Sequence, residues 1–227
     1  MTMWSKLKVF VTAWFKKKTS ACRLFERLRR YASLTHTSIC QLHEAENRIP
    51  CPRSSFFCGA ESKIPALNFD AVKDVYCNNA RISPWPSVDG VLYKDERFLF
   101  VEIKSWRNFE RYQIKPGDSP SEIQKKIVDK AKGFKLKPKV EKSMEICKKI
   151  SKDEHLFDKM PVTYILVTDV DTVPDPLARF KSRLRALAYK SVYIPLFSSA
   201  STSQLSTVGM DVRYVFCQRF DEFYDTL

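Results

Sequence analysis

The alternation of apolar and polar positions is clearest in residues 85–106, where two apolar stretches flank a short charged run. Residues 88–93 and 97–104 are rich in β-branched and aromatic side chains, and the charged residues 94–97 lie between them. This pattern predicts a β-hairpin centred on Asp95 and Glu96. Both faces of the hairpin carry apolar side chains, so we expect it to lie in the interior of a sheet that is covered on both sides.

Helical spacing of apolar residues predicts helices before and after this hairpin. In residues 119–122 a Ser, a Pro and a Glu stand at the N-cap, first and third positions of a helix, which is a strong start signal. We expect this helix to be separated by Pro138 from the next one, which continues to residue 150. The other predicted helices span residues 4–14, 20–31, 37–48 and 175–187.

Apolar runs predict further strands at residues 162–168, 191–197 and 211–217, and Ser, Thr, Gly and Pro predict loops at 50–65 and 198–207. Residues 68–77 fit either a strand or a short helix. The order of these elements predicts an α/β fold in which helices flank a mixed central β-sheet.

The predicted hairpin register places Asp89 directly opposite Glu102, with Cβ atoms about 5 Å apart. Lys104 lies on the same face as Glu102 because side chains alternate along a strand. Two facing acids in a buried sheet repel each other and lose hydration unless a cation lies between them. Carboxylate oxygens at this separation suit Mg²⁺ or Mn²⁺.

Asp89 followed by Glu102, Ile103 and Lys104 resembles the PD-(D/E)xK signature of the restriction-endonuclease-like nucleases. The run Glu-Ile-Lys-Ser is similar to the form found in archaeal Holliday-junction resolvases, although Val88 stands where the family usually has proline. The resemblance implies a restriction-endonuclease-like core and metal-dependent endonuclease or exonuclease activity, on DNA more than on RNA. In that mechanism Asp89, Glu102 and the Ile103 carbonyl hold the metal, and Lys104 positions or deprotonates the attacking water.

The same resemblance implies further site residues and favours a strand at residues 68–77. An acid from the first helix of the core often completes the metal site, so Glu44 and Glu46 are candidates, and Glu61 in the following loop is a third. Gln124 is a candidate polar helper on the helix after the hairpin. A solvated helix end is at least an equal alternative for Glu44 and for Glu46, and an exposed first-turn glutamine is the favoured interpretation of Gln124.

Lys and Arg outnumber Asp and Glu by 39 to 26, which gives a net charge of +13 and favours a polyanionic partner such as nucleic acid. Basic residues gather on two predicted helices and are candidate phosphate contacts: Lys125, Lys126, Lys130, Lys132, Arg179 and Arg183. A non-catalytic nucleic-acid-binding protein that keeps the nuclease fold is therefore the alternative function. The sequence does not determine the oligomeric state, and a dimer is one of the open alternatives.

The first 43 residues contain one acid, Glu26, among many basic residues at amphipathic spacing. A nucleic-acid arm, a membrane-surface helix and a cleaved organelle-targeting segment all have this composition. We favour an arm packed on the core, and divide the chain into a basic helical extension (1–35) and a nuclease-like domain (36–227).

Seven irregularly spaced cysteines indicate reduced thiols and an intracellular protein. Cys40, His43, Cys51 and Cys58 lack the spacing of a zinc or iron–sulfur site, so buried thiols are favoured. No apolar run approaches the length of a membrane span. A membrane-surface helix near the N-terminus stays an open alternative, and we otherwise expect no membrane partner.

Overall fold

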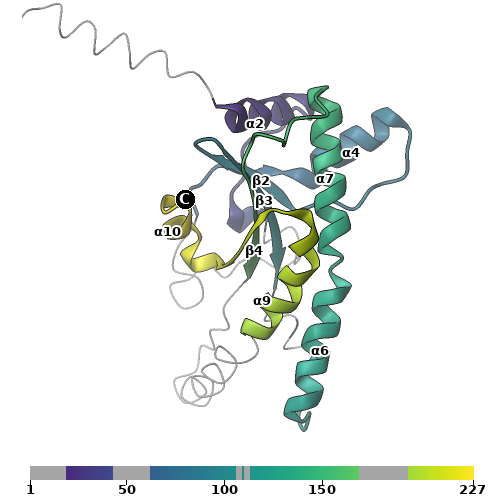
Figure 1. Ribbon diagram of the computed structural model, residues 1–227, viewed down its shortest axis with the longest axis vertical. Helices are drawn as coiled ribbons and strands as arrows, with labels where there is room; N and C mark the ends of the chain where they lie inside the picture. The colour runs from purple at the N-terminus through teal and green to yellow at the C-terminus, as the bar shows by residue number, and fades with distance from the viewer. Residues whose placement is uncertain (1–18, 43–61, 106–108, 110–112, 169–193) are drawn as a thin grey trace, which may run out of the picture.

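The computed structural model describes residues 19–42, 62–105, 109, 113–168 and 194–227, which build a five-stranded sheet flanked by helices (Figure 1). The strands are β1 (Leu67–Asn68), β2 (Gly90–Lys94), β3 (Arg97–Lys104), β4 (Val162–Thr168) and β5 (Asp211–Phe216). They lie in sequence order across the sheet, antiparallel from β1 to β3 and parallel from β3 to β5. The predicted mixed sheet is thus confirmed.

Helices connect and cover these strands. They are α2 (Ser20–Tyr31), α4 (Phe69–Ala80), α6 (Pro120–Gly133), α7 (Leu136–Ser151), α9 (Ile194–Thr202) and α10 (Phe220–Asp225), with short 3₁₀ helices η2 (Ser203–Val208) and η3 (Cys217–Arg219). Helices α6 and α7 form the crossover between the parallel strands β3 and β4, and Figure 1 shows them following one another along one side of the molecule.

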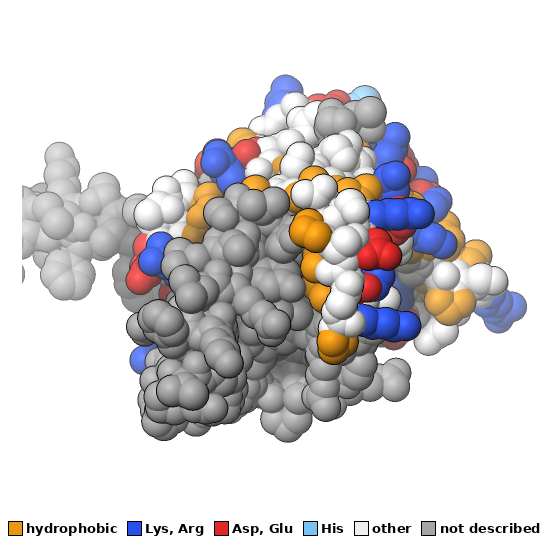
Figure 2. Space-filling model, turned by 90° about the horizontal axis from the view of Figure 1, so that it is seen from below, with side chains coloured by type: hydrophobic (Ala, Val, Ile, Leu, Met, Phe, Trp, Pro, Cys, Tyr) orange, Lys and Arg blue, Asp and Glu red, His pale blue; other side chains and the backbone are white. Residues whose placement is uncertain are grey.

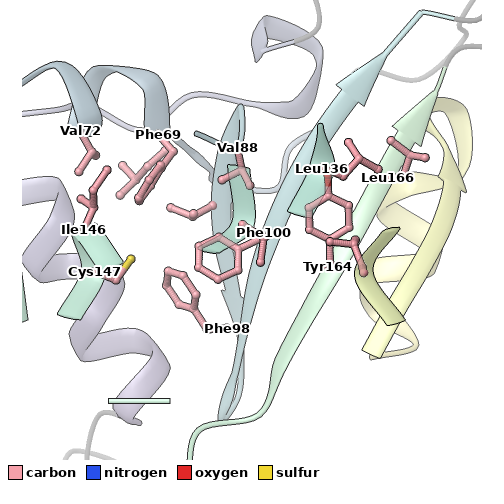
Figure 3. Close-up of a cluster of buried hydrophobic side chains, with 14 of the residues drawn as sticks. Phe69, Val72, Val88, Phe98, Phe100, Leu136, Ile146, Cys147, Tyr164 and Leu166 are labelled. Atoms are coloured by element: carbon pink, nitrogen blue, oxygen red, sulfur yellow. The ribbon is translucent and has the colours of Figure 1, made fainter. Parts of the chain in front are cut away.

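The two faces of the sheet bury separate apolar clusters. On one face, Phe98 and Phe100 of β3 and Tyr164 of β4 pack against α2, α4 and α7, as Figure 3 shows for Phe69, Ile146 and their neighbours. On the other face, Val101, Ile103 and their neighbours pack against residues 39–42 and α10. The hairpin is therefore buried on both faces, as its sequence predicted.

Helix α2 begins where its sequence predicted, at the Thr19 N-cap, whose side chain accepts a hydrogen bond from the Cys22 N–H. Leu24, Phe25 and Leu28 are buried in the core of the sheet face that α7 also covers. The second of the two predicted basic helices thus packs on the core. The first, in residues 1–18, lies outside the described residues, and the domain boundary at residue 35 stays a prediction.

The predicted strand at residues 68–77 is wrong, because this segment forms helix α4. The Asn68 side chain caps the helix by accepting a hydrogen bond from the Ala71 N–H at 3.2 Å. Phe69, Val72 and Cys77 are buried on one helical face. An N-cap followed by this spacing favours a helix over a strand, and the strand is limited to β1.

The predicted strand at 191–197 and loop at 198–207 are also wrong where the structure describes them. Helix α9 starts at Ile194, with Pro195 in its first turn, where a proline costs no internal hydrogen bond. Phe197 and Ser201, four residues apart, are both buried. Packing on α6 stabilises a helix in a Ser/Thr-rich segment whose local propensity favours a loop.

The predicted start of α6 is confirmed in detail, because Ser119 and Glu122 form a reciprocal capping box and Pro120 occupies the first turn. The break before α7 comes earlier than Pro138, at Phe134 and Lys135, and Lys135 adopts a left-handed conformation with φ 52°. Pro138 instead lies in the first turn of α7. Among the described residues, no helix is long and apolar enough to cross a membrane.

Candidate metal centre

The hairpin register brings Asp89 and Glu102 to the open end of β2 and β3. Val91 pairs with Phe100 and Tyr93 with Phe98, as predicted, and the last strand pair is Gly90 with Val101. Asp89 directly precedes β2, so continuing this register by one residue places it opposite Glu102. Asp95 adopts a positive φ of 50° in the turn, which a tight two-residue turn between twisted strands requires.

Backbone contacts hold Asp89 against the end of β3. Its Oδ2 accepts a hydrogen bond from the Ile103 N–H at 2.6 Å, and its carbonyl accepts one from the Phe69 N–H at 3.1 Å. The preceding Val88 N–H donates to the Ser143 Oγ of α7 at 3.0 Å, and this hydroxyl donates to the Lys139 carbonyl. Helices α4 and α7 therefore both fix the segment that carries the first acid.

Two lysines lie between the two acids. Lys104 Nζ is 2.7 Å from Glu102 Oε1 and 3.7 Å from Asp89 Oδ2, and it donates to the Ile103 carbonyl at 2.9 Å. Lys139 Nζ is 2.5 Å from Glu102 Oε1 and 3.6 Å from Asp89 Oδ1. We call Asp89, Glu102, Lys104 and Lys139 the acid–lysine cluster; the exposed side-chain fractions are 6%, 0%, 12% and 21%.

Lys139 was not predicted from the sequence. It comes from the first turn of α7, three residues after Leu136 and four before Ser143, both of which are fully buried. Residues at these spacings share one face of a helix. A lysine on the buried face of an amphipathic helix was thus the available signal, although the sequence does not indicate which acids it meets.

Two buried oxygens beside the cluster lack hydrogen-bond partners among the described residues: Glu102 Oε2 and the Tyr164 hydroxyl. Burial, followed by the charges of Glu102 and Asp89, raises the pKa of Tyr164 well above its usual value of 10.0. The hydroxyl therefore stays protonated and can only donate toward these acids. An unpartnered, buried carboxylate oxygen is costly, and a cation or an ordered water would offset that cost.

The oxygens at this position fit a hard divalent cation. Mg²⁺ prefers oxygen ligands and is commonly held by one or two carboxylates, with waters and substrate phosphates completing its octahedron. Asp89, Glu102 and the Ile103 carbonyl would supply such a set. Within the described ranges no group of three or more His, Cys, Asp or Glu side chains comes together, so this chain would contribute two carboxylates from the described residues.

The other predicted site residues are placed in part. Gln124 is exposed on α6, as are Lys125, Lys130 and Lys132. Lys126 forms an ion pair with Asp118 at 2.6 Å, and this hydrogen bond, together with one from the Lys115 N–H, lowers the pKa of Asp118. The remaining candidates lie outside the described residues: Glu44, Glu46, Glu61, Arg179 and Arg183.

The junction between α6 and α7 lies next to the cluster. The ring of Phe134 has Lys104 Nζ 5.5 Å from its centroid and Lys130 Nζ 5.7 Å from it. Gln204 donates to the Ala131 carbonyl at 2.7 Å and accepts from the Leu136 N–H at 3.3 Å, so one side chain bonds both helices at the break. The predicted phosphate-binding helix α6 thus ends beside the predicted metal site.

No protein-family model, curated protein or solved structure matches this chain. The resemblance to the PD-(D/E)xK nucleases accordingly rests on the motif residues and their geometry.

Proposed function

We propose that this protein is a metal-dependent nuclease with a restriction-endonuclease-like core. The observation that carries the proposal is the convergence of Glu102 Oε1, the Ile103 carbonyl and Asp89 Oδ2, which all lie within 3.7 Å of one point, the Lys104 ammonium. These are the three groups to which the PD-(D/E)xK resemblance assigns the metal. Their convergence supports a shared cation.

Asp89, Glu102 and the Ile103 carbonyl would hold Mg²⁺ or Mn²⁺, which lowers the pKa of a bound water and offsets charge on a phosphate. Lys104 lies two residues beyond Glu102 on the same strand face, with its ammonium within hydrogen-bond reach of that carboxylate. From there the ammonium would orient the attacking water and stabilise the charge that develops on the phosphate, or, as a neutral amine, Lys104 would take the proton of that water and become the ammonium. The fully buried Glu102 is shielded from bulk water, which strengthens these interactions.

The charge of the chain supports a nucleic-acid substrate, and we propose DNA in preference to RNA. The net charge is +13, and Figure 2 shows Lys and Arg side chains gathered on the right-hand side of the visible face, with acidic side chains among them. Such charge binds phosphates without reading sequence.

The test is incubation of the full chain with labelled DNA and RNA duplexes, junctions and single strands, with and without Mg²⁺ or Mn²⁺. The proposal expects cleavage only with metal, and loss of cleavage in Asp89→Asn. Lys137→Gln, a change at a half-exposed position of α7 that pairs with Glu141, controls for nuclease contamination, since a contaminant would cut equally in every preparation. Absence of cleavage on all substrates with either metal contradicts the proposal.

One observation favours the second candidate, a nucleic-acid-binding protein without catalysis. Lys104 and Lys139 balance the charge of Asp89 and Glu102, so the cluster is neutral without a metal. A protein of this kind would bind DNA with the same affinity in Mg²⁺ and in EDTA at matched ionic strength, and would cut under neither condition.

A further inference from the structure

Lys139 is the member of the acid–lysine cluster that the proposed mechanism does not use. Its ammonium contacts both Glu102 and Asp89, and within the described part of the chain these carboxylates are its ion-pair partners. It arrives from α7, a different element from the hairpin that carries the motif. The proposed mechanism therefore does not explain why this lysine lies between the two acids.

The charges of the cluster decide what a metal ion would do there. Two carboxylates and two ammonium groups sum to zero, and all four side chains are largely buried. A divalent cation would leave a surplus of two positive charges in a poorly solvated site, which is strongly unfavourable. Both lysines also bond the same atom, Glu102 Oε1, so a cation bound to that oxygen removes a hydrogen bond from at least one of them.

Lys139 is the lysine that is easier to displace. Lys104 is 12% exposed, and its ammonium also donates to the Ile103 carbonyl and lies over the Phe134 ring. The Lys139 side chain is 21% exposed, and both of its carboxylate partners are candidate metal ligands. A metal on Glu102 Oε1 would take that oxygen from Lys139. A metal on Asp89 would also neutralise the carboxylate whose Oδ1 contacts Lys139, so the ammonium would need another anion.

We propose that Lys139 is an internal counter-cation, which a divalent metal displaces from Asp89 and Glu102 and which then binds a phosphate of the nucleic acid. This inference rests on the proposed function. Its consequence is thermodynamic coupling: the nucleic acid supplies the negative charge that the metal-bound site lacks. Metal and nucleic acid therefore each increase the affinity for the other, by the same factor.

The experiment measures Ca²⁺ affinity of the full chain by calorimetry, alone and with a saturating DNA duplex, because Ca²⁺ suits the same oxygen ligands as Mg²⁺. For the wild type we expect DNA to tighten Ca²⁺ binding by about tenfold, a typical coupling factor. Lys139→Gln should bind Ca²⁺ about tenfold more tightly than wild type without DNA, because its competitor is gone. The additional effect of DNA should largely disappear.

Lys137→Gln is the matched control, since it removes one lysine charge from the same turn of α7, where Lys137 faces Glu141 at 3.8 Å and not the acids. It should behave as wild type in both titrations. In Lys139→Gln the introduced amide can still donate to Glu102, and folding of the variant is checked by circular dichroism. If the variant is too unstable, Lys139→Met replaces it: the unbranched side chain carries no charge and should likewise tighten Ca²⁺ binding and lose most of the coupling.

Three results would count against these statements in different ways. If the wild type binds Ca²⁺ and cuts DNA but Lys139→Gln has unchanged Ca²⁺ affinity, the role proposed for Lys139 is wrong and the proposed function is not affected. Equal gains in Lys139→Gln and Lys137→Gln reduce the effect to general charge and also overturn it. Wild type that neither binds a divalent cation nor cuts nucleic acid overturns the proposed function, and the inference with it.

Discussion

Two halves of one sheet face differ completely in chemistry although both are buried. Toward the turn of the hairpin, Phe98 and Phe100 are fully buried among apolar side chains. Two residues further along β3, on the same face, Glu102 is equally buried, and it forms ion pairs with Lys104 and Lys139. The side chains on this face thus change from apolar to charged within two residues of β3.

Stability alone does not explain why acids occupy this buried position. Burying the phenylalanines stabilises the fold by roughly 25 cal/mol per Å² of apolar surface. Burying the acid–lysine cluster costs several kcal/mol per ion in desolvation, and well-packed apolar residues often replace such pairs without loss. A charged cluster at this position is therefore best explained by chemistry, and substitutions in the two halves should have opposite signatures.

The largest effect is expected from Asp89→Asn in the charged half. Cleavage should fall at least about 1,000-fold, or about 4 kcal/mol in transition-state stabilisation, because the metal loses one of the two carboxylates that the described residues would supply. The fold should survive, since the Asn amide oxygen can still accept the Ile103 N–H that Asp89 Oδ2 binds. Single-turnover cleavage and circular dichroism measure the two parts. A folded variant that cuts at the wild-type rate removes Asp89 from the mechanism.

In the apolar half, Phe100→Ala should show the reverse signature. The free energy of unfolding should fall by about 3–5 kcal/mol, the usual cost of a large cavity. Cleavage per folded molecule should stay near wild type, because Phe100 belongs to the apolar core cluster and is not a candidate metal ligand. Urea unfolding and single-turnover cleavage at low temperature test this. Loss of cleavage in molecules that remain folded would mean that the two halves are not separable.

Lys104→Ala should separate chemistry from binding within the charged half. The cleavage rate should fall by about 100-fold, or about 2.7 kcal/mol, while DNA affinity in Ca²⁺ changes far less. Lys104→Arg should not restore the rate, because a guanidinium stays protonated and presents a planar fork. If Lys104→Ala is fully active while Asp89→Asn is inactive, the metal site is retained but Lys104 is not the water-positioning residue.

Outside the cluster, the exposed lysines of α6 should affect affinity and not rate. Replacing Lys125, Lys130 and Lys132 by Gln should lower the slope of log K against log salt by about 0.9 for each lost duplex contact. Lys126→Gln is the control, and should change the slope less because Asp118 already pairs with Lys126. An unchanged slope in the triple variant would transfer the phosphate contacts to another surface.

The smallest effect is expected at the boundary between the two halves, where Tyr164→Phe removes a hydroxyl that has no hydrogen-bond partner in the described part of the chain. Stability at pH 7 should change by about 1 kcal/mol or less. Above pH 10 the unfolded tyrosine ionises while the folded one, with its raised pKa, keeps its proton, so the wild type loses stability as pH rises. Urea unfolding between pH 9 and 11 should therefore show a gentler decline for the variant. Parallel declines would contradict the raised pKa.

The hairpin and its acids could be predicted from sequence because their geometry is local. Alternation and the charged turn fix the register, and the register alone brings Asp89, Glu102 and Lys104 together. The capping box of α6 was predictable for the same reason, since its residues lie within one turn. Short-range sequence patterns were sufficient to predict contacts between residues that are close along the chain.

Features that depend on distant partners were not predictable. Lys139 meets Glu102 across 37 residues, and only the packing of α7 on the sheet brings them together. Helix α9 has a Ser- and Thr-rich sequence with loop propensity, and its contact with α6 stabilises it. At α4 the error was different, because Asn68 offered a cap that outweighs the family pattern on physical grounds.

Anomalous diffraction from crystals of the wild-type protein soaked in Mn²⁺ would locate the proposed metal ion itself. The account predicts a manganese peak between Asp89 and Glu102, bound to an oxygen of each and to the Ile103 carbonyl at about 2.1–2.2 Å, near the Mg²⁺ distance, with Lys139 displaced from Glu102. The absence of an anomalous peak at saturating Mn²⁺, with both lysines still bonded to Glu102 Oε1, would contradict a metal site between these acids.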